Sequence, residues 1–113
     1  MLFRSEIDVR AVYIALTLAD LLGIMTPELA AGTRQFVASC QSHEGGFAGE
    51  PGCEPHGGYN FCAAASIKIL NAWGYDRIDA RSHARWIATK QMPYEGGFQG
   101  RSHKLVDGCY SFW

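Results

Sequence analysis

The chain has 113 residues, of which 48% are hydrophobic and 12% aromatic, and its formal net charge is −1 at pH 7. This length allows one small domain, and the apolar content is typical of a packed protein and excludes a disordered one. The balanced charge gives no general attraction for nucleic acid or an anionic membrane, and the longest apolar run is too short to cross a bilayer. We therefore expect neither a nucleic-acid-binding protein nor an integral membrane protein.

Five helices are predicted from apolar residues that recur near the 3.6-residue period, from capping residues and from terminal glycines. Asp8 suits the first helix start and Gly23 its end, while Thr-Pro-Glu at 26–28 combines a capping hydroxyl, a first-turn proline and a first-turn acid. The third helix is expected to reach Trp73, with Gly74 as its C-cap. No segment alternates with period two, so we predict an all-α protein. The expected helices cover 8–22, 26 to 40 or 41, 58–73, 79–91 and a short stretch that opens at residue 107.

The chain contains four cysteines, an even number that would allow two disulfides. However, no C-x-x-C pair and no signal peptide accompany them. We therefore expect reduced thiols and an intracellular, cytoplasmic protein. The four are Cys40, Cys53, Cys62 and Cys109.

The sequence repeats itself after about 50 residues. Glu-Gly-Gly-Phe-Ala-Gly at 44–49 returns as Glu-Gly-Gly-Phe-Gln-Gly at 95–100, and the same offset of 51 aligns His56 with Asp107. Asp8 opens a helix in the equivalent way, 48 residues before His56. The unit is a pair of helices joined through a glycine-rich turn, and such units stack. We expect residues 1–113 to form a single segment, of about two repeats plus stubs, of a larger array.

Each glycine-rich turn leads toward a helix N-terminus, where free N–H groups and the helix dipole favour an anion. His56 and the glycines after it occupy one such end, and Arg101 and Lys104 precede another. Two loop cations taken alone are more often simply solvated. Because His56 and aromatic residues stand at equivalent places in the repeat, we interpret the cations as part of an anion site.

Asp107 and Cys109 join a carboxylate and a thiol, two donors that zinc accepts. Catalytic zinc usually has three protein ligands, and this chain shows only two in plausible spacing. Taken alone, such a pair is more often a capping aspartate and a buried cysteine. The aromatic residues nearby suit core packing as well as an apolar ligand. A third zinc ligand is left open among His43, His83 and His103.

Three motifs together resemble the β subunit of protein farnesyltransferase, in the protein prenyltransferase β-subunit family. They are E-G-G-F-Q-G-R-x-x-K-L-V-D-G-C-Y-S-F-W at 95–113, H-G-G-Y-x-F-C at 56–62 and D-V-R-x-x-Y at 8–13. The resemblance covers nearly the whole chain. It implies an α/α toroid, a barrel of helix pairs, that works as a heterodimer with a farnesyltransferase α subunit. The implied reaction is zinc-dependent transfer of farnesyl from farnesyl diphosphate to the cysteine of a C-terminal CaaX sequence in a substrate protein.

The resemblance also implies roles by motif position. Asp107 and Cys109 match two of the three zinc ligands, and the third is a histidine on a later helix, beyond this sequence. Arg10 matches the residue that reads the terminal carboxylate of the substrate peptide. Charge on the departing diphosphate would be stabilised, without a general base, by His56, Arg101, Lys104 and Tyr110. The residues that would hold the isoprenoid diphosphate or line its tunnel are Tyr13, His56, Gly57, Gly58, Tyr59, Cys62, Arg101, Ser102, His103, Lys104, Tyr110 and Trp113.

Three alternatives stay open. A type I geranylgeranyltransferase β subunit shares much of the long motif, although Tyr59 and the run at 105–108 favour farnesyl transfer. A non-catalytic product would bind isoprenoid diphosphate without turnover, and we expect little or no catalysis from these 113 residues alone. A terpene cyclase is disfavoured, because the chain has no D-x-D-D-type motif and a diphosphate-free reaction would not use Arg101 and Lys104.

Overall fold

The computed structural model describes residues 8–71 and 78–113, which form five helices. Within those ranges the only β-structure is three isolated bridges, so the all-α prediction is confirmed. The expected end of the third helix at Trp73 and Gly74 lies outside the described residues. No described helix has the length and apolar character needed to span a membrane. The helices are α1 (Val9–Leu22), α2 (Pro27–Ser39), α3 (Gly57–Leu70), α4 (Ala80–Thr89) and α5 (Gly108–Phe112).

The helix boundaries follow the predicted signals closely. The Thr26 hydroxyl accepts a hydrogen bond from an N–H in the first turn of α2, and Gly23 ends α1 in the left-handed conformation with φ 68°. Helices α2 and α4 end slightly earlier than predicted. The N–H groups of Cys40 and Lys90 bond three residues back, at 3.1 and 3.0 Å, which tightens the last turn and releases the chain into the glycine-rich segment.

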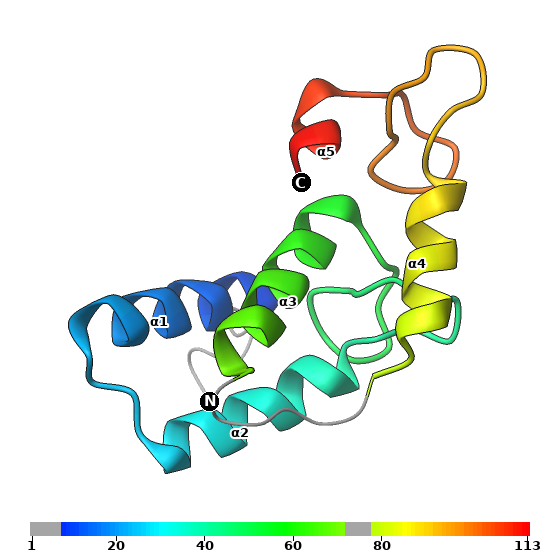
Figure 1. Ribbon diagram of the computed structural model, residues 1–113. Coiled ribbons are helices and arrows are strands. Elements are labelled where there is room, and N and C mark those ends of the chain that lie inside the picture. Colours follow the sequence, from blue (N-terminus) through cyan, green and yellow to red (C-terminus); the bar gives the residue numbers. More distant parts are fainter. Residues whose placement is uncertain (1–7, 72–77) are drawn as a thin grey trace.

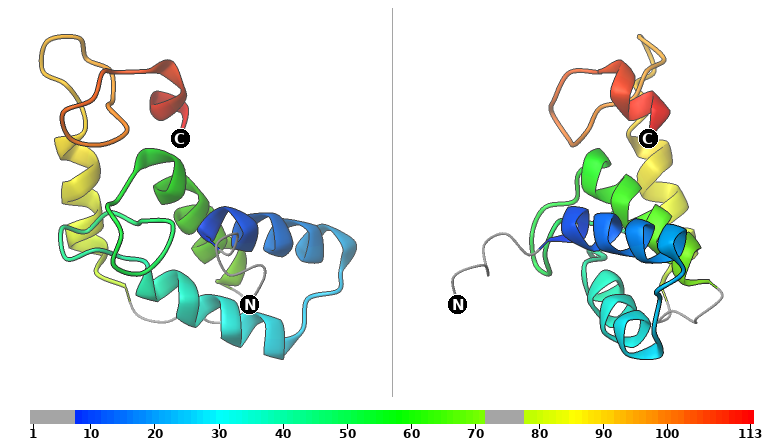
Figure 2. Two further views of the ribbon diagram at one scale, coloured as in Figure 1. Left: turned by 180° about the vertical axis from the view of Figure 1, so that it is seen from behind. Right: turned by 90° about the vertical axis from the view of Figure 1, so that its left-hand side faces the viewer.

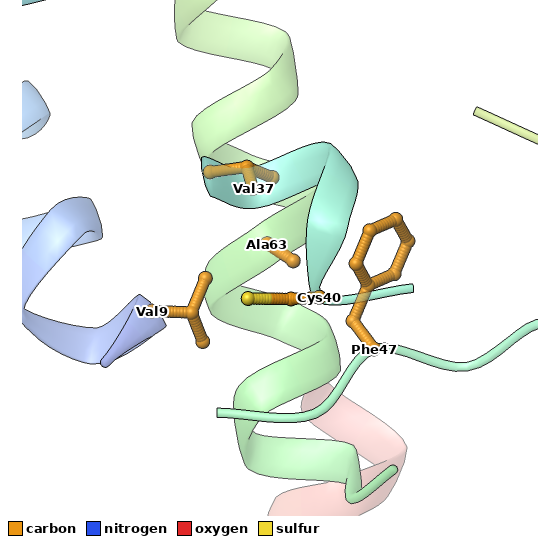
Figure 3. Close-up of a cluster of buried hydrophobic side chains, with 5 residues drawn as sticks. All are labelled: Val9, Val37, Cys40, Phe47 and Ala63. Carbon is orange, nitrogen blue, oxygen red and sulfur yellow. The ribbon is translucent and has the colours of Figure 1, made fainter. Parts of the chain in front are cut away.

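Helix α3 is the centre of the molecule, with α1 and α2 against it and α5 beside its N-terminal end (Figures 1 and 2). The principal core joins α1, α2 and α3 to the first glycine-rich segment, and none of its five residues is more than 2% exposed. Burial raises the pKa of the Cys40 thiol in this core to about 11. All four cysteines are free, as predicted. The five side chains, drawn in Figure 3, are Val9, Val37, Cys40, Phe47 and Ala63.

The repeat seen in the sequence is also a repeat of hydrogen bonds. We call residues 41–49 the first turn and residues 91–100 the second turn. In each, a glutamine side chain and a backbone N–H close the loop onto the paired glycines, and an isolated bridge reaches the phenylalanine. The bonds are Ser42 N–H to Gly46 O (2.8 Å) and Met92 N–H to Gly97 O (2.8 Å), with Gln41 Nε2 to Gly45 O (3.0 Å) and Gln91 Nε2 to Gly96 O (2.9 Å).

The final glycine of each turn connects one unit to the next. Its carbonyl accepts from the first residue of an earlier helix: Val9 N–H donates to Gly49 O at 3.0 Å, and Gly57 N–H to Gly100 O at 2.8 Å. These bonds bring the N-termini of α1 and α3 to the glycine-rich turns. The three equivalent helices open alike, because each N-cap side chain accepts from the N–H two residues later. The cap distances are 2.9 Å for Asp8, 3.1 Å for His56 and 3.0 Å for Asp107.

Candidate functional site

A hollow of about 640 Å³ lies among α1, α3 and α5, and we call it the apolar hollow. Most of its walls are aromatic and aliphatic side chains, while a histidine and an arginine add polar groups. Its volume and lining are typical of a small-molecule site. It is lined by Arg10, Tyr13, Ile14, His56, Gly58, Tyr59, Phe61, Cys62, Cys109, Tyr110 and Trp113.

Aromatic rings from three separate elements form one wall of the apolar hollow. The Tyr13 and Phe61 ring centroids are 5.5 Å apart, Phe61 and Trp113 are 6.3 Å apart, and Trp113 and Tyr110 are 5.7 Å apart. Rings in such edge-to-face and stacked arrangements hold one another in place. The wall therefore presents a fixed apolar surface to a chain-like ligand.

His56 and Tyr110 place hydrogen-bond donors beside this wall. Nδ1 of His56 accepts from the Gly58 N–H at 3.1 Å, so in the neutral ring the proton is on Nε2, which lies 3.4 Å from the Tyr110 hydroxyl. Burial, and then the nearby charge of Arg101, lower the pKa of His56. The imidazole is therefore a neutral donor. Its Nε2–H faces the Tyr110 oxygen, so the Tyr110 O–H is left to donate to an anion.

Arg10 lies at the α1 side of the apolar hollow. Its guanidinium is 2.6 Å from an oxygen of Asp8 and 5.2 Å from the centre of the Tyr59 ring. The Asp8 side chain is only 9% exposed, whereas that of Arg10 is 63% exposed. The hydrogen bonds from Arg10 are the largest cause that lowers the pKa of Asp8. The carboxylate of Asp8, which caps α1, thus orients the Arg10 guanidinium, whose other side faces solvent.

The predicted cationic loop lies next to the apolar hollow but does not line it. Arg101 Nη1 bonds to Glu54 Oε1 at 3.1 Å, and Ser102 Oγ accepts from Lys90 Nζ at 3.2 Å. His103 takes φ 65°, a left-handed conformation that a non-glycine residue seldom adopts, and Lys104 is exposed. The loop is therefore held by Lys90 and Glu54, with the Lys104 ammonium in solvent.

Asp107 and Cys109 lie together at the start of α5. The Cys109 N–H donates to Asp107 Oδ1 at 3.0 Å, and this and the thiol's own bond lower the pKa of Asp107. Burial first, and then the carboxylate, raise the pKa of the Cys109 thiol. An oxygen and a sulfur donor in contact suit zinc. Across residues 8–71 and 78–113, no group of three His, Cys, Asp or Glu residues that would hold a metal is found.

The apolar hollow thus collects nine of the residues singled out from the sequence, but not the 101–104 loop, Asp107 or Gly57. Gly57 instead lines a smaller recess among α3, α4, α5 and the second turn, and Asp107 caps α5. Two lining residues, Ile14 and Phe61, were absent from the predicted site. Both had a signal: Phe61 is inside the H-G-G-Y-x-F-C motif, and Ile14 follows Tyr13 on α1.

Comparison with known proteins gives the family context. The family model of the prenyltransferase alpha-alpha toroid domain matches residues 1–113. The protein farnesyltransferase β subunits of Arabidopsis thaliana and Pisum sativum are 48% and 49% identical, over 96% and 97% of this chain. The geranylgeranyl transferase type-1 β subunit of Arabidopsis thaliana is 34% identical over 96% of the chain and 31% of its own length.

A solved structure agrees with these matches. The Candida albicans protein geranylgeranyltransferase-I complexed with GGPP superposes with a TM-score of 0.77 at 30% identity, over 94% of this chain and 32% of that one. The chain spans only 22% and 26% of the length of the two farnesyltransferase relatives.

Proposed function

Because the chain belongs to the prenyltransferase alpha-alpha toroid family, we propose that it is a segment of a protein farnesyltransferase β subunit. The observation that carries the proposal is the apolar hollow, whose aromatic wall meets the donors His56 and Tyr110. A ligand with an apolar chain and an anionic head fits such a site, and farnesyl diphosphate has both. The higher identity to farnesyltransferase (48%) than to geranylgeranyl transferase (34%) supports the shorter isoprenoid.

In the proposed reaction, the sulfur of a CaaX cysteine forms a bond to C1 of the farnesyl group while the bond from C1 to the diphosphate oxygen breaks. Negative charge grows on the departing diphosphate. The Tyr110 O–H donates to it, supported by the His56 Nε2–H on the Tyr110 oxygen, and Arg101 and Lys104 add positive charge from the adjoining loop. Donors that are already in place before charge develops stabilise the transition state without reorganisation. No general base is needed.

We propose that Asp107 and Cys109 are two ligands of a zinc site whose third ligand lies outside these 113 residues. Zinc bound there would keep the substrate cysteine in its nucleophilic thiolate form. Arg10, oriented by Asp8, would bind the terminal carboxylate of the CaaX peptide. We propose that the active enzyme is a heterodimer, which an α subunit would complete.

The test uses a chimera in which this chain replaces the matched 110 residues of the Pisum sativum β subunit, expressed with its α subunit. We expect transfer of labelled farnesyl to a CaaX peptide, with farnesyl diphosphate preferred over geranylgeranyl diphosphate. Cys109→Ala should remove both zinc and turnover, and Tyr110→Phe should slow the single-turnover rate. A folded heterodimer that transfers no prenyl group, or a Cys109→Ala variant that keeps full zinc, would contradict the proposal.

A further inference from the structure

An ion pair next to the proposed diphosphate site has no role in the function outlined so far. Glu54 Oε1 and Arg101 Nη1 lie 3.1 Å apart, although 47 residues separate them in sequence. Glu54 stands two residues before the helix cap His56, and Arg101 directly follows Gly100 of the second turn. The pair therefore connects the segment that opens α3 to the loop that carries the candidate phosphate-binding cations.

The residues on either side of Arg101 have contacts of their own, apart from this pair. Gly100 accepts from the Gly57 N–H at 2.8 Å, and Ser102 is held by Lys90 at 3.2 Å. A Cβ atom at Gly100 would come within 2.5 Å of the Tyr110 ring, so the loop and α5 are in close contact. A backbone bond before Arg101 and a side-chain bond after it restrain the loop, and the long side chain of Arg101 keeps freedom of its own.

Glu54 restrains that remaining freedom from outside the apolar hollow. It does not line the hollow, and instead borders a separate polar recess with Ser42, His43 and Glu44. Arg101 also acts on His56 more strongly than Glu54 does: the guanidinium lowers the pKa of His56, and the carboxylate opposes it with a smaller effect.

The pair is suited to positioning more than to stability. The side chains of Arg101 and Glu54 are 43% and 54% exposed, and ion pairs in such surroundings add little to folding. Among the described residues, the guanidinium bonds only through Nη1, so its other N–H groups are available to a ligand. A planar guanidinium held at one nitrogen still presents two others for bidentate contact with phosphate oxygens.

We propose that Glu54 is a positioning residue, which holds the Arg101 guanidinium beside His56 in the orientation that receives the diphosphate. The proposal rests on the proposed function. The negative charge of the Glu54 carboxylate alone would weaken diphosphate binding. By orienting Arg101, however, the same carboxylate would strengthen that binding. That opposition between geometry and charge makes the proposal testable.

The experiment titrates the 113-residue chain with farnesyl diphosphate by calorimetry, after circular dichroism has verified its helix content. The variants are Glu54→Gln, Arg101→Gln and the double variant, with Glu50→Gln as the control. Glu50 is exposed in the same loop, and its substitution removes the same charge. We expect Glu54→Gln to weaken binding about two- to fivefold and Arg101→Gln about tenfold. Glu50→Gln should leave binding equal or slightly tighter, and the double variant should match Arg101→Gln.

Each outcome has one meaning. If the parent chain binds and Glu54→Gln binds as well as Glu50→Gln does, or if its loss persists in the Arg101→Gln background, the positioning role is wrong while the proposed function stands. If neither the folded parent chain nor the folded chimeric enzyme binds farnesyl diphosphate, both are wrong. The KM for farnesyl diphosphate of the same variants in the chimeric enzyme provides a second readout. There Glu54→Gln should raise the KM only when Arg101 is present.

Discussion

The first and second turns share a sequence and a set of hydrogen bonds, but they differ in what lies against them. Phe47 in the first turn is completely buried, while its counterpart Phe98 in the second turn is only partly buried. Phe47 belongs to the core shared with α1, α2 and α3, and α4 adds His83 against its ring and Trp86 against Gly46. The motif therefore fixes the conformation of the turn locally, whereas the neighbouring helices decide how much stability the turn contributes.

Polar contacts also join the first turn to α3 and α4. Asn60 Oδ1, buried in α3, accepts from the Phe47 N–H at 3.2 Å and lies 2.9 Å from Nε2 of His83 in α4. Because an amide oxygen only accepts, the His83 ring donates to it through Nε2–H. The imidazole also stacks edge-to-face on Phe47, with ring centroids 5.1 Å apart. In the described part of the second turn, no such network is present.

The largest expected effect comes from the matched phenylalanines. Phe47→Ala should lower the free energy of unfolding by about 3–5 kcal/mol, the usual loss for a fully buried aromatic side chain. Phe98→Ala should cost about half as much or less, because part of that ring already faces solvent. Urea unfolding followed by circular dichroism measures both. Equal losses would show that the two turns are equally packed, contrary to this comparison.

Substituting the matched glycines Gly46 and Gly97 should change the stability by an intermediate amount, and only the space for a methyl group differs between them. Neither Gly46 nor Gly97 has a positive φ, so an added methyl group tests space alone. At Gly46 it would overlap the Trp86 indole, whereas at Gly97 its nearest neighbour is Val106 at 3.5 Å, an ordinary contact. We expect Gly46→Ala to destabilise by about 1–3 kcal/mol. Gly97→Ala should be neutral or stabilising by up to about 1 kcal/mol. If thermal unfolding shows Gly97→Ala to be less stable than Gly46→Ala, the first turn is not the more closely packed of the two.

The smallest effect is a pH dependence that belongs to the first turn. Burial lowers the pKa of His83, so near and below pH 6.5 the unfolded chain binds more protons than the folded one. The stability from a neutral His83 is complete above about pH 6.5 and declines as the pH falls through and below that value. His83→Gln should therefore reduce the fall in stability between pH 7 and pH 5. A residual slope is expected from His56, whose pKa is also lowered. If His83→Gln leaves the dependence of stability on pH unchanged, His83 is not a cause of it.

Much of the fold was predictable because its signals are local. The caps Asp8, Thr26 and Asp107 and the stop at Gly23 act within one turn of helix, and each is present as expected. The repeat was also readable, since both turns keep the same residues at the hydrogen-bonded positions. The burial of the first turn by the neighbouring helices was not predictable in this way. It depends on contacts such as that of Gly46 with Trp86, which no local pattern encodes.

In the candidate site too, the residues marked by local sequence motifs were predicted, whereas a long-range contact was not. Its apolar residues were found because the motifs place Tyr13, Tyr59 and Tyr110 on helices, and the stacking of repeats brings those helices together. Their roles toward a ligand remain predictions. The partner of Arg101 was missed, because the carboxylate that meets it lies 47 residues away in a different loop. Long side chains of opposite charge meet only once the backbone has placed their loops together.

We propose that the apolar hollow binds a ligand with both an isoprenoid chain and a diphosphate. The most direct test is a calorimetric titration of the folded 113-residue chain with farnesyl diphosphate, inorganic pyrophosphate and farnesol in parallel. We expect farnesyl diphosphate to bind more tightly than either part alone, and Tyr110→Phe to weaken its binding. If farnesyl diphosphate binds no more tightly than pyrophosphate, the aromatic wall has no part in recognition and the proposed site is wrong.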